Sequence, residues 1–458
     1  MKKKVLLVAV AATLITGLAA CSSGGTDPSS TSAAPGPDAL DSASGVTEIS
    51  IWHGLGASAG EAFEKLIDEF NTANEGKIHV TSTYQGAYAD LLAKYTAGVR
   101  TNDVPTVLLA GDVATGFLVD LGQTIPATSL AQANPEDLNV DDLVPAAANY
   151  YTVDGTLEAV PMNVSTPMLW VNWDLMAQAG LSKDTPLATL DDVVAAAKTV
   201  SEKTGEAGFT MPSDDWYIEQ LTATAGQNFC DPDNGRNGTA PTGITINTGD
   251  AKDAISKISE LYTSGAAVDG DPRGDAAYSI FTAGKVALDL YSSGVAGGFS
   301  SDAQFDYSAL PFPTNSSSED AGNIIGGSAL WSSSTGTPAE QVAGWKLTSF
   351  LASPEAQEEF SQATGYVPIN QEVASSATEK DYLAANPGSQ VIIDQVQNTP
   401  VSTVTAGCVT GAMTSIRTSN MNQIQAAWAG QKSIGEALDQ AAEDAKAALE
   451  QYQTQLGE

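Results

Sequence analysis

The sequence predicts an α/β fold with a mostly parallel β-sheet, and the order of its first elements is the main reason. Alternating polar and apolar residues predict a strand at residues 48–52, and further strands are expected at residues 78–83 and 104–110. Apolar residues at helical spacing predict helices between these strands, at residues 59–70 and 88–99. A β-α-β-α-β order places parallel strands in one sheet with helices on its faces.

A second region repeats this pattern, and a chain of 458 residues has room for two cores. A strand is expected at residues 168–171, followed by a helix that ends at Gly180. Capping residues predict helix starts at Thr189, Ser353 and Ser433. Two more helices are expected at residues 251–262 and 342–351.

The composition argues against several functional classes. Asp and Glu total 55 against 20 Lys and Arg, and the net charge of −35 repels nucleic acid. With only two histidines and three cysteines, the chain shows no cluster with zinc-ligand spacing. It also lacks a G-x-S-x-G elbow and a P-loop, so we expect no metal, no cofactor and no enzymatic activity. A hydrolase using paired carboxylates is the alternative that these absences leave open.

The first residues are typical of an export signal. Lys2, Lys3 and Lys4 precede an uncharged apolar run at residues 5–17, which is too short for a comfortable membrane span. Small residues then lead to Cys21, and this junction resembles the bacterial lipobox, which implies a signal peptide over residues 1–21 and a lipid on Cys21. A secretory signal with an incidental cysteine and an uncleaved anchor are the alternatives.

Residues 22–45 are rich in Ser, Gly, Ala, Pro and Thr, and they predict a disordered tether that holds a folded body beginning at residue 46. Removal of the signal leaves Cys230 and Cys408 as a pair. Outside the cell two cysteines favour a disulfide, and two separate buried thiols are the alternative.

Five segments resemble one known family, the family 1 extracellular solute-binding proteins of ABC importers. They are residues 97–105, 169–180, 284–288, 350–357 and 364–368. The resemblance covers nearly all of residues 48–456. It implies a two-lobe, periplasmic-binding-protein-like type II fold with a hinge between the lobes, and a monomer that binds a small molecule.

The expected lobe boundaries follow from this resemblance. The N-terminal lobe is expected at residues 46–159 and 305–333, and the C-terminal lobe at residues 160–304 and 334–458. The chain is then expected to cross between the lobes near Val160, Ser300 and Ser334.

Within the family, four segments resemble the subfamily that binds glycerol 3-phosphate or glycerophosphodiesters. They are residues 51–53, 84–88, 324–331 and 420–421. Matching its motifs position by position implies eight ligand-binding residues: Tyr88, Asp112, Ser165, Trp216, Ser292, Gly327, Tyr366 and Arg417. Asp112 replaces the Glu of the subfamily, and Ser213 stands where a second Trp is usual. Both changes suggest a larger ligand, such as a glycerophosphodiester.

The residue types suit a phosphorylated polyol. Arg417 is expected to donate two hydrogen bonds to the phosphate. Neutral donors are expected from Ser165, Ser292, Tyr366 and the Gly327 N–H. Asp112 and Tyr88 can bind glycerol hydroxyls, and Trp216 can cover C–H groups. Each residue also has a structural alternative, because serines and Asp112 can cap helices and aromatic side chains usually lie in the core.

The sequence therefore predicts a lipid-anchored receptor on the extracytoplasmic face of a bacterial membrane, which delivers glycerol 3-phosphate or a glycerophosphodiester to the membrane subunits of an ABC importer. An oligosaccharide receptor of a carbohydrate importer is the alternative, and a cell-surface hydrolase is a further one.

Overall fold

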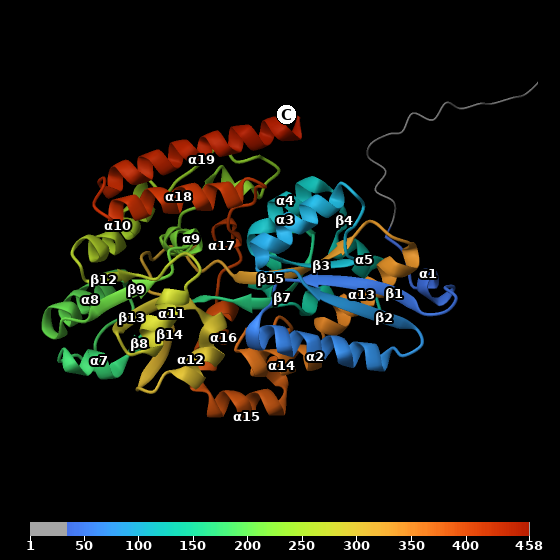
Figure 1. Cartoon of the computed structure of the whole chain (residues 1–458), viewed down its shortest axis with the longest axis horizontal. Helices are drawn as coiled ribbons and strands as arrows, with labels where there is room; N and C mark the ends of the chain where they lie inside the picture. Colours follow the sequence, from blue (N-terminus) through green and yellow to red (C-terminus); the bar gives the residue numbers. More distant parts are fainter. Residues whose placement is uncertain (1–33, 458) are drawn as a thin grey trace, which may run out of the picture. The chain divides into compact units, whose positions relative to one another are not determined.

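The first of two main sheets is built largely from the N-terminal part of the chain. The computed structural model describes residues 34–457 (Figure 1), so Cys21 and the predicted signal segment lie outside the described residues. Six strands form this sheet, in the order β2-β1-β3-β15-β4 with β7 paired to β15. Strand β1 is parallel to β2 and β3, and β15 is antiparallel to β3 and β7. The strands are β1 (Thr47–His53), β2 (Ile78–Tyr84), β3 (Val107–Gly111), β4 (Thr124–Ile125), β7 (Val160–Ser165) and β15 (Gly326–Ser333).

The second sheet has five strands in the order β12-β9-β13-β8-β14. The adjacent pairs β12–β9 and β9–β13 are parallel, and β8 is antiparallel to both β13 and β14. Every residue of β8 is buried, which explains its continuous apolar run. The strands are β8 (Pro167–Asn172), β9 (Ala207–Met211), β12 (Ala267–Asp269), β13 (Val286–Ser292) and β14 (Tyr307–Pro311).

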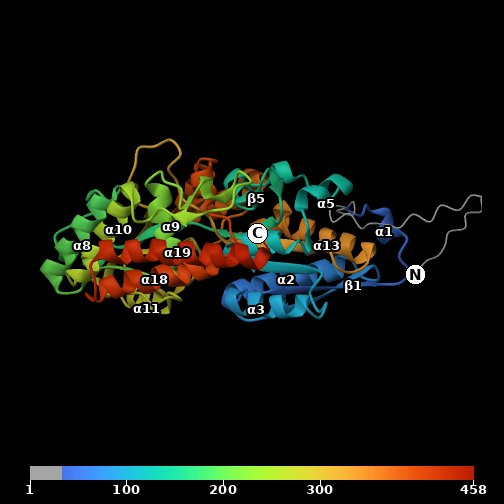
Figure 2. The same cartoon turned by 90° about the horizontal axis from the view of Figure 1, so that it is seen from above.

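Helices cover both sheets, and each sheet with its helices forms one lobe. On the first sheet lie α2 (Ala57–Ala73), α3 (Tyr88–Val99), α13 (Pro338–Leu351) and α14 (Pro354–Thr364), while α4 (Thr115–Leu121), α5 (Ala127–Ala133) and α6 (Pro145–Tyr150) contact its edge strands or its connections. The second lobe contains α7 (Trp173–Gln178), α8 (Leu190–Thr204), α9 (Asp215–Thr224), α10 (Gly249–Thr263), α11 (Asp275–Thr282), α12 (Ala296–Asp302), α18 (Met413–Trp428) and α19 (Ile434–Leu456). The last two lie side by side (Figure 1 and Figure 2). The predicted α/β two-lobe architecture is therefore confirmed.

The predicted helix starts are confirmed in detail. The side chains of Thr189, Ser353 and Ser433 each accept a hydrogen bond from the first turn of α8, α14 and α19. These bonds satisfy backbone N–H groups that have no partner inside the helix.

The chain changes sheet at places that differ from the predicted boundaries. Strand β7 ends at Ser165 in the first sheet, and β8 begins at Pro167 in the second. The return occurs between β14 and β15, and α13 then packs against β1. These facts correct the crossing points expected near Val160, Ser300 and Ser334. The positions depend on which distant strands pair, and local sequence patterns do not report that.

Residues 34–45 are ordered against the first lobe. They include α1 (Asp38–Asp41), which contacts α13, and Leu40 packs against the apolar core of that lobe. The Pro35 carbonyl accepts a hydrogen bond of 3.0 Å from Asn134 Nδ2. The predicted tether of residues 22–45 is therefore too long at its C-terminal end, because α1 and Leu40 pack against the folded body.

A disulfide and a buried arginine fix the chain near the start of α18. Cys230 and Cys408 form a disulfide across a sequence separation of 178 residues. Arg236 is 7% exposed and donates hydrogen bonds to the carbonyls of Tyr150, Thr152, Ala406 and Gly407. The disulfide and Arg236 together hold the segment that leads into α18.

The structure also shows that no helix within residues 34–457 is both long and apolar enough to cross a bilayer.

We expect the double variant Cys230→Ser, Cys408→Ser to lose about 2–5 kcal/mol of unfolding free energy, because a closed loop of this length restricts the unfolded chain. Urea denaturation followed by circular dichroism measures the loss, and the reduced wild-type protein is the comparison. A double variant as stable as the oxidised wild type would contradict the expectation.

Candidate functional site

A cavity of about 320 Å³ lies where the two lobes meet, and all eight ligand-binding residues predicted from the sequence line it. Its lining consists of Tyr88, Asp112, Ser165, Pro212, Asp214, Trp216, Tyr217, Pro272, Arg273, Tyr291, Ser292, Gly326, Gly327, Tyr366 and Arg417. The sequence prediction missed Asp214, Tyr217 and Tyr291. Asp214 and Tyr217 lie beside the predicted Trp216 at the start of α9, and Tyr291 precedes Ser292, so proximity along the chain was the available signal.

The first lobe contributes residues from the ends of its strands. Asp112 follows β3, Ser165 ends β7, and Gly327 is the second residue of β15. Open α/β sheets present ligand sites at such strand ends. The second lobe adds Ser292 from the end of β13 and Arg417 from α18.

Tyr88 depends on two glycines. A Cβ atom on Gly54 or on Gly111 would lie 2.8 Å from atoms of the Tyr88 ring, so larger residues would displace it. The Tyr88 hydroxyl accepts a hydrogen bond of 3.1 Å from Asn163 Nδ2. Burial raises the pKa of Tyr88, so its phenol stays neutral and can donate to a ligand.

Gly326 and Gly327 let the start of β15 lie close to β7 and to the Trp216 ring. Gly327 has φ +113°, and a Cβ there would lie 1.8 Å from the Asn163 carbonyl oxygen. A Cβ on Gly326 would lie 2.8 Å from the Trp216 ring. The two positions therefore require glycine for β15 to meet both β7 and the indole of Trp216.

Trp216 and Ser292 are held by neighbours within the second lobe. The backbone N–H of Trp216 donates a hydrogen bond to Asp214 Oδ1 at 2.8 Å, which caps α9. The Ser292 N–H donates to the Tyr217 hydroxyl at 2.9 Å. Ser213, which replaces the second Trp of the subfamily, lies outside the cavity lining and donates to Asp269 instead.

Arg417 lies between carboxylates from both lobes. Its Nε donates to Glu219 Oε1 at 2.5 Å, and its Nη2 lies 3.6 Å from Asp112 Oδ2. The Arg417 side chain is 14% exposed, and that of Glu219 is 1% exposed. The guanidinium therefore has two anionic neighbours, but its Nη2 has no hydrogen-bond partner within residues 34–457. Donation from Arg417 to a phosphate stays a prediction.

Burial dominates the ionisation of this cluster. It raises the pKa of Glu219 to about 7, although Arg417 acts in the opposite direction. It also raises the pKa of Asp112, again against Arg417, and it raises that of Asp215 well above its usual range. Burial alone would lower the pKa of Arg417, but Glu219 and Asp112 outweigh it, so the guanidinium is charged.

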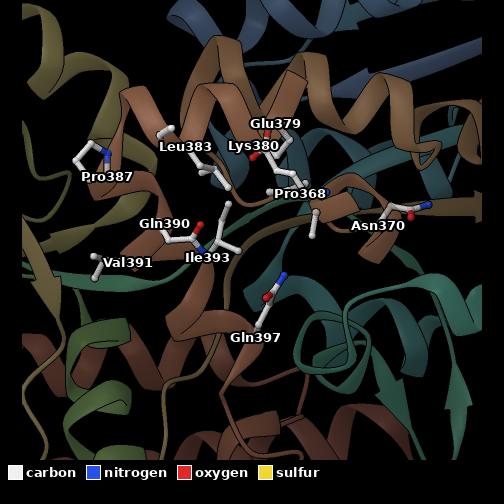
Figure 3. Close-up of a pocket in the computed structure, with 12 residues that line it drawn as sticks. Pro368, Asn370, Glu379, Lys380, Leu383, Pro387, Gln390, Val391, Ile393 and Gln397 are labelled. Carbon is white, nitrogen blue, oxygen red and sulfur yellow. The ribbon is translucent and has the colours of Figure 1, made fainter. Parts of the chain in front are cut away.

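Two other cavities lack this convergence. A cavity of about 560 Å³ lies among α15 (Ala377–Ala385), α16 (Pro387–Gln397) and the preceding 3-10 turn (Figure 3), and none of the eight predicted residues lines it. An apolar cavity of about 520 Å³ lies beside α3, and Tyr88 lines both this cavity and the one between the lobes. Among residues 34–457 no group of three or more acidic, His or Cys side chains could hold a metal ion.

Comparison with known proteins gives one family and several relatives. The family model described as bacterial extracellular solute-binding protein matches residues 65–387. The sn-glycerol-3-phosphate-binding periplasmic protein UgpB of Escherichia coli K12 is 28% identical over 420 residues, which is 90% of this chain and 95% of the relative. The UgpB of Salmonella paratyphi A is 27% identical over 413 residues, with 89% and 94% coverage.

Solved structures share the fold. UgpB from Mycobacterium tuberculosis in complex with glycerophosphocholine superposes with a TM-score of 0.75 at 21% identity, covering 88% of this chain and 98% of that one. The cyclic alpha-maltosyl-1,6-maltose binding protein from Arthrobacter globiformis gives a TM-score of 0.72 at 21% identity, with 88% and 99% coverage.

We expect Gly327→Ala to lower the free energy of unfolding by about 1–3 kcal/mol more than Gly180→Ala does. Both glycines have positive φ, but a Cβ on Gly180 meets nothing within 4 Å, so the difference isolates the clash with Asn163. Denaturant titration of both variants provides the comparison, and equal losses would show that β15 adjusts without cost.

Proposed function

Because the chain belongs to the bacterial extracellular solute-binding proteins, which are receptors of ABC importers and not enzymes, we propose that it binds a glycerophosphate ester between its lobes. The ester is glycerol 3-phosphate or a glycerophosphodiester. The observation that carries the proposal is the meeting of all eight predicted residues, from both lobes, in one cavity.

The phosphate is bound mainly by neutral donors. Ser165, Ser292, Tyr88 and Tyr366, which each carry a hydroxyl group, line the cavity together with Gly327. Such donors stabilise a phosphate through charge-assisted hydrogen bonds to its oxygen atoms. We assign the phosphate mainly to neutral donors because Arg417 already pairs with Glu219 and Asp112.

The Arg417–Asp112 pair binds the glycerol end. A hydroxyl both donates and accepts, so it can donate to the Asp112 carboxylate and accept from the guanidinium. Two adjacent hydroxyls of a glycerol unit match such a pair, and the Trp216 ring covers the C–H groups. The Escherichia coli relative is named for glycerol 3-phosphate, and the similar Mycobacterium tuberculosis structure is a complex with glycerophosphocholine. Both support this ligand class.

An oligosaccharide is the second candidate. Trp216, Tyr217 and Tyr291 line the cavity with aromatic surface, which suits sugar rings, and Arg417 is already neutralised. The Arthrobacter globiformis neighbour, named for a cyclic maltosyl-maltose, has the same fold.

The proposed cellular setting combines the family with the N-terminal sequence. A lipid on Cys21 anchors the receptor to the extracytoplasmic face of the membrane, as a monomer that delivers its ligand to the importer's membrane subunits. The lipobox-like residues before Cys21 support the anchor.

We expect Arg417→Ala to weaken binding of glycerol 3-phosphate and glycerophosphocholine by about 2–5 kcal/mol, because Asp112 and Glu219 lose their cation and repel the phosphate. Isothermal titration calorimetry measures the change, and Arg100→Ala, an exposed arginine outside the cavity lining, is the matched control.

Maltose and longer oligosaccharides belong in the same panel. Binding of sugars without either phosphate ester would overturn the phosphate proposal and favour the second candidate. A loss below tenfold in Arg417→Ala would remove Arg417 from the site.

A further inference from the structure

We propose that Glu219 selects the charge of the ligand: it neutralises Arg417 from within the protein and so favours a glycerophosphodiester over a phosphate monoester. The inference rests on the proposed function and decides between its two ligand classes. It names a selectivity residue that does not line the cavity itself.

Glu219 is placed to act as an internal counter-ion. It lies one turn after Trp216 on α9, and the residue is fully buried. Its Oε1 accepts from Arg417 Nε at 2.5 Å, whereas its Oε2 is buried without a hydrogen-bond partner in the described part of the chain. Because water does not reach this carboxylate, its charge acts on Arg417 and on the cavity with little screening.

Carboxylates outnumber cations around this pair. Asp112 of the 3-10 turn after β3 lies 3.6 Å from Arg417, and Asp214 at the start of α9 lines the cavity. Asp215 accepts from Asn420 of α18 at 3.0 Å. Tyr150 of α6 also faces the cluster, and burial raises the pKa of its phenol, so it remains neutral.

The remaining arginine of the lining does not correct the imbalance. Arg273 has a side chain that is 85% exposed, and it pairs with Asp275 at 3.1 Å. A ligand therefore enters a site in which Arg417 is the one buried cation beside three acidic side chains of the described lining and its support, Glu219, Asp112 and Asp214. Burial raises the pKa of Asp215 well above its usual range, so Asp215 adds no charge.

The consequence depends on ligand charge. A phosphate monoester carries about −1.5 to −2 near pH 7, whereas a diester carries about −1. Each additional negative charge is repelled by carboxylates that Arg417 cannot balance alone. Removing the Glu219 charge frees Arg417 and benefits the monoester more than the diester.

The test compares glycerol 3-phosphate with its methyl ester, which differs by one methyl group and one charge. Calorimetry at pH 8, where the monoester is dianionic, gives both dissociation constants. We expect the wild type to bind the methyl ester roughly tenfold or more tightly than the monoester, and Glu219→Gln to reduce this ratio roughly tenfold, mainly through tighter monoester binding.

Asp137→Asn is the matched control. The Asp137 side chain is 7% exposed and pairs with Lys346 of α13, as Glu219 pairs with Arg417, but it lies outside the cavity lining. We expect this variant to leave the ratio unchanged. An unchanged ratio in Glu219→Gln, with both esters still binding, would overturn the inference and leave the proposed function standing. If neither ester binds the wild type, the proposed function fails and the inference fails with it.

A second measurement needs no variant. The charge of the methyl ester is constant from pH 7 to 8. Any protons that are taken up when it binds are therefore gained by the protein. Burial raises the pKa of Glu219 to about 7, and an anion bound in the nearby cavity raises this pKa further. Binding should therefore take up protons, and affinity should rise as pH falls from 8 to 7. Calorimetry in two buffers of different ionisation enthalpy counts these protons, and net proton release on binding would contradict the inference, because it would mean that the anion lowers the pKa of the carboxylates.

Discussion

The passage of the chain from β7 to β8 through the single residue Thr166 is the constraint on which the site depends. The Thr166 N–H donates to Ser293 Oγ at 3.1 Å, and its carbonyl accepts from the Ser293 N–H at 2.8 Å. Strand register does the rest. Ser165 pairs with Gly326, and Pro167 pairs with Ser292. Ser165 of the first sheet and Ser292 of the second are thereby held close to Thr166. Both can then donate hydrogen bonds to a single anion.

Arg417 joins the lobes in a second way, through an ion pair to the other lobe that is longer than its pair within its own lobe. Its tight partner Glu219 belongs to the same lobe, whereas Asp112 belongs to the other and lies 3.6 Å away. The longer contact crosses the cleft, so separation of the lobes breaks it first and leaves the Arg417–Glu219 pair intact. On the proposed function, a polyol that bonds both Arg417 and Asp112 stabilises the closed arrangement by its differential affinity for it.

Motif matching predicted eight of the residues that line the candidate cavity, but it did not predict the charges around Arg417. Motif matching located residues such as Ser165 and Tyr366 because each follows a recognisable turn or strand. It missed Glu219, whose spacing from Trp216 places both on one helix face but whose partner lies 198 residues away along the chain. The sheet crossings at Thr166 and after β14 were missed for the same reason. Local patterns encode helices, strands and caps, whereas strand partners and ion pairs depend on contacts between distant segments.

Neutralisation of Arg417 also bears on how a receptor discriminates between solutes. A free buried arginine attracts many anions, so the rest of the ligand contributes little to selection. When Glu219 and Asp112 balance the guanidinium, charge alone no longer suffices, and affinity requires correct hydrogen bonds at both ends of the ligand. Specificity is a difference between affinities, and lowering the shared electrostatic part increases the weight of the contacts that differ. On the proposed function, the acidic residues around Arg417 thus sacrifice some affinity for anions in general and increase discrimination among them.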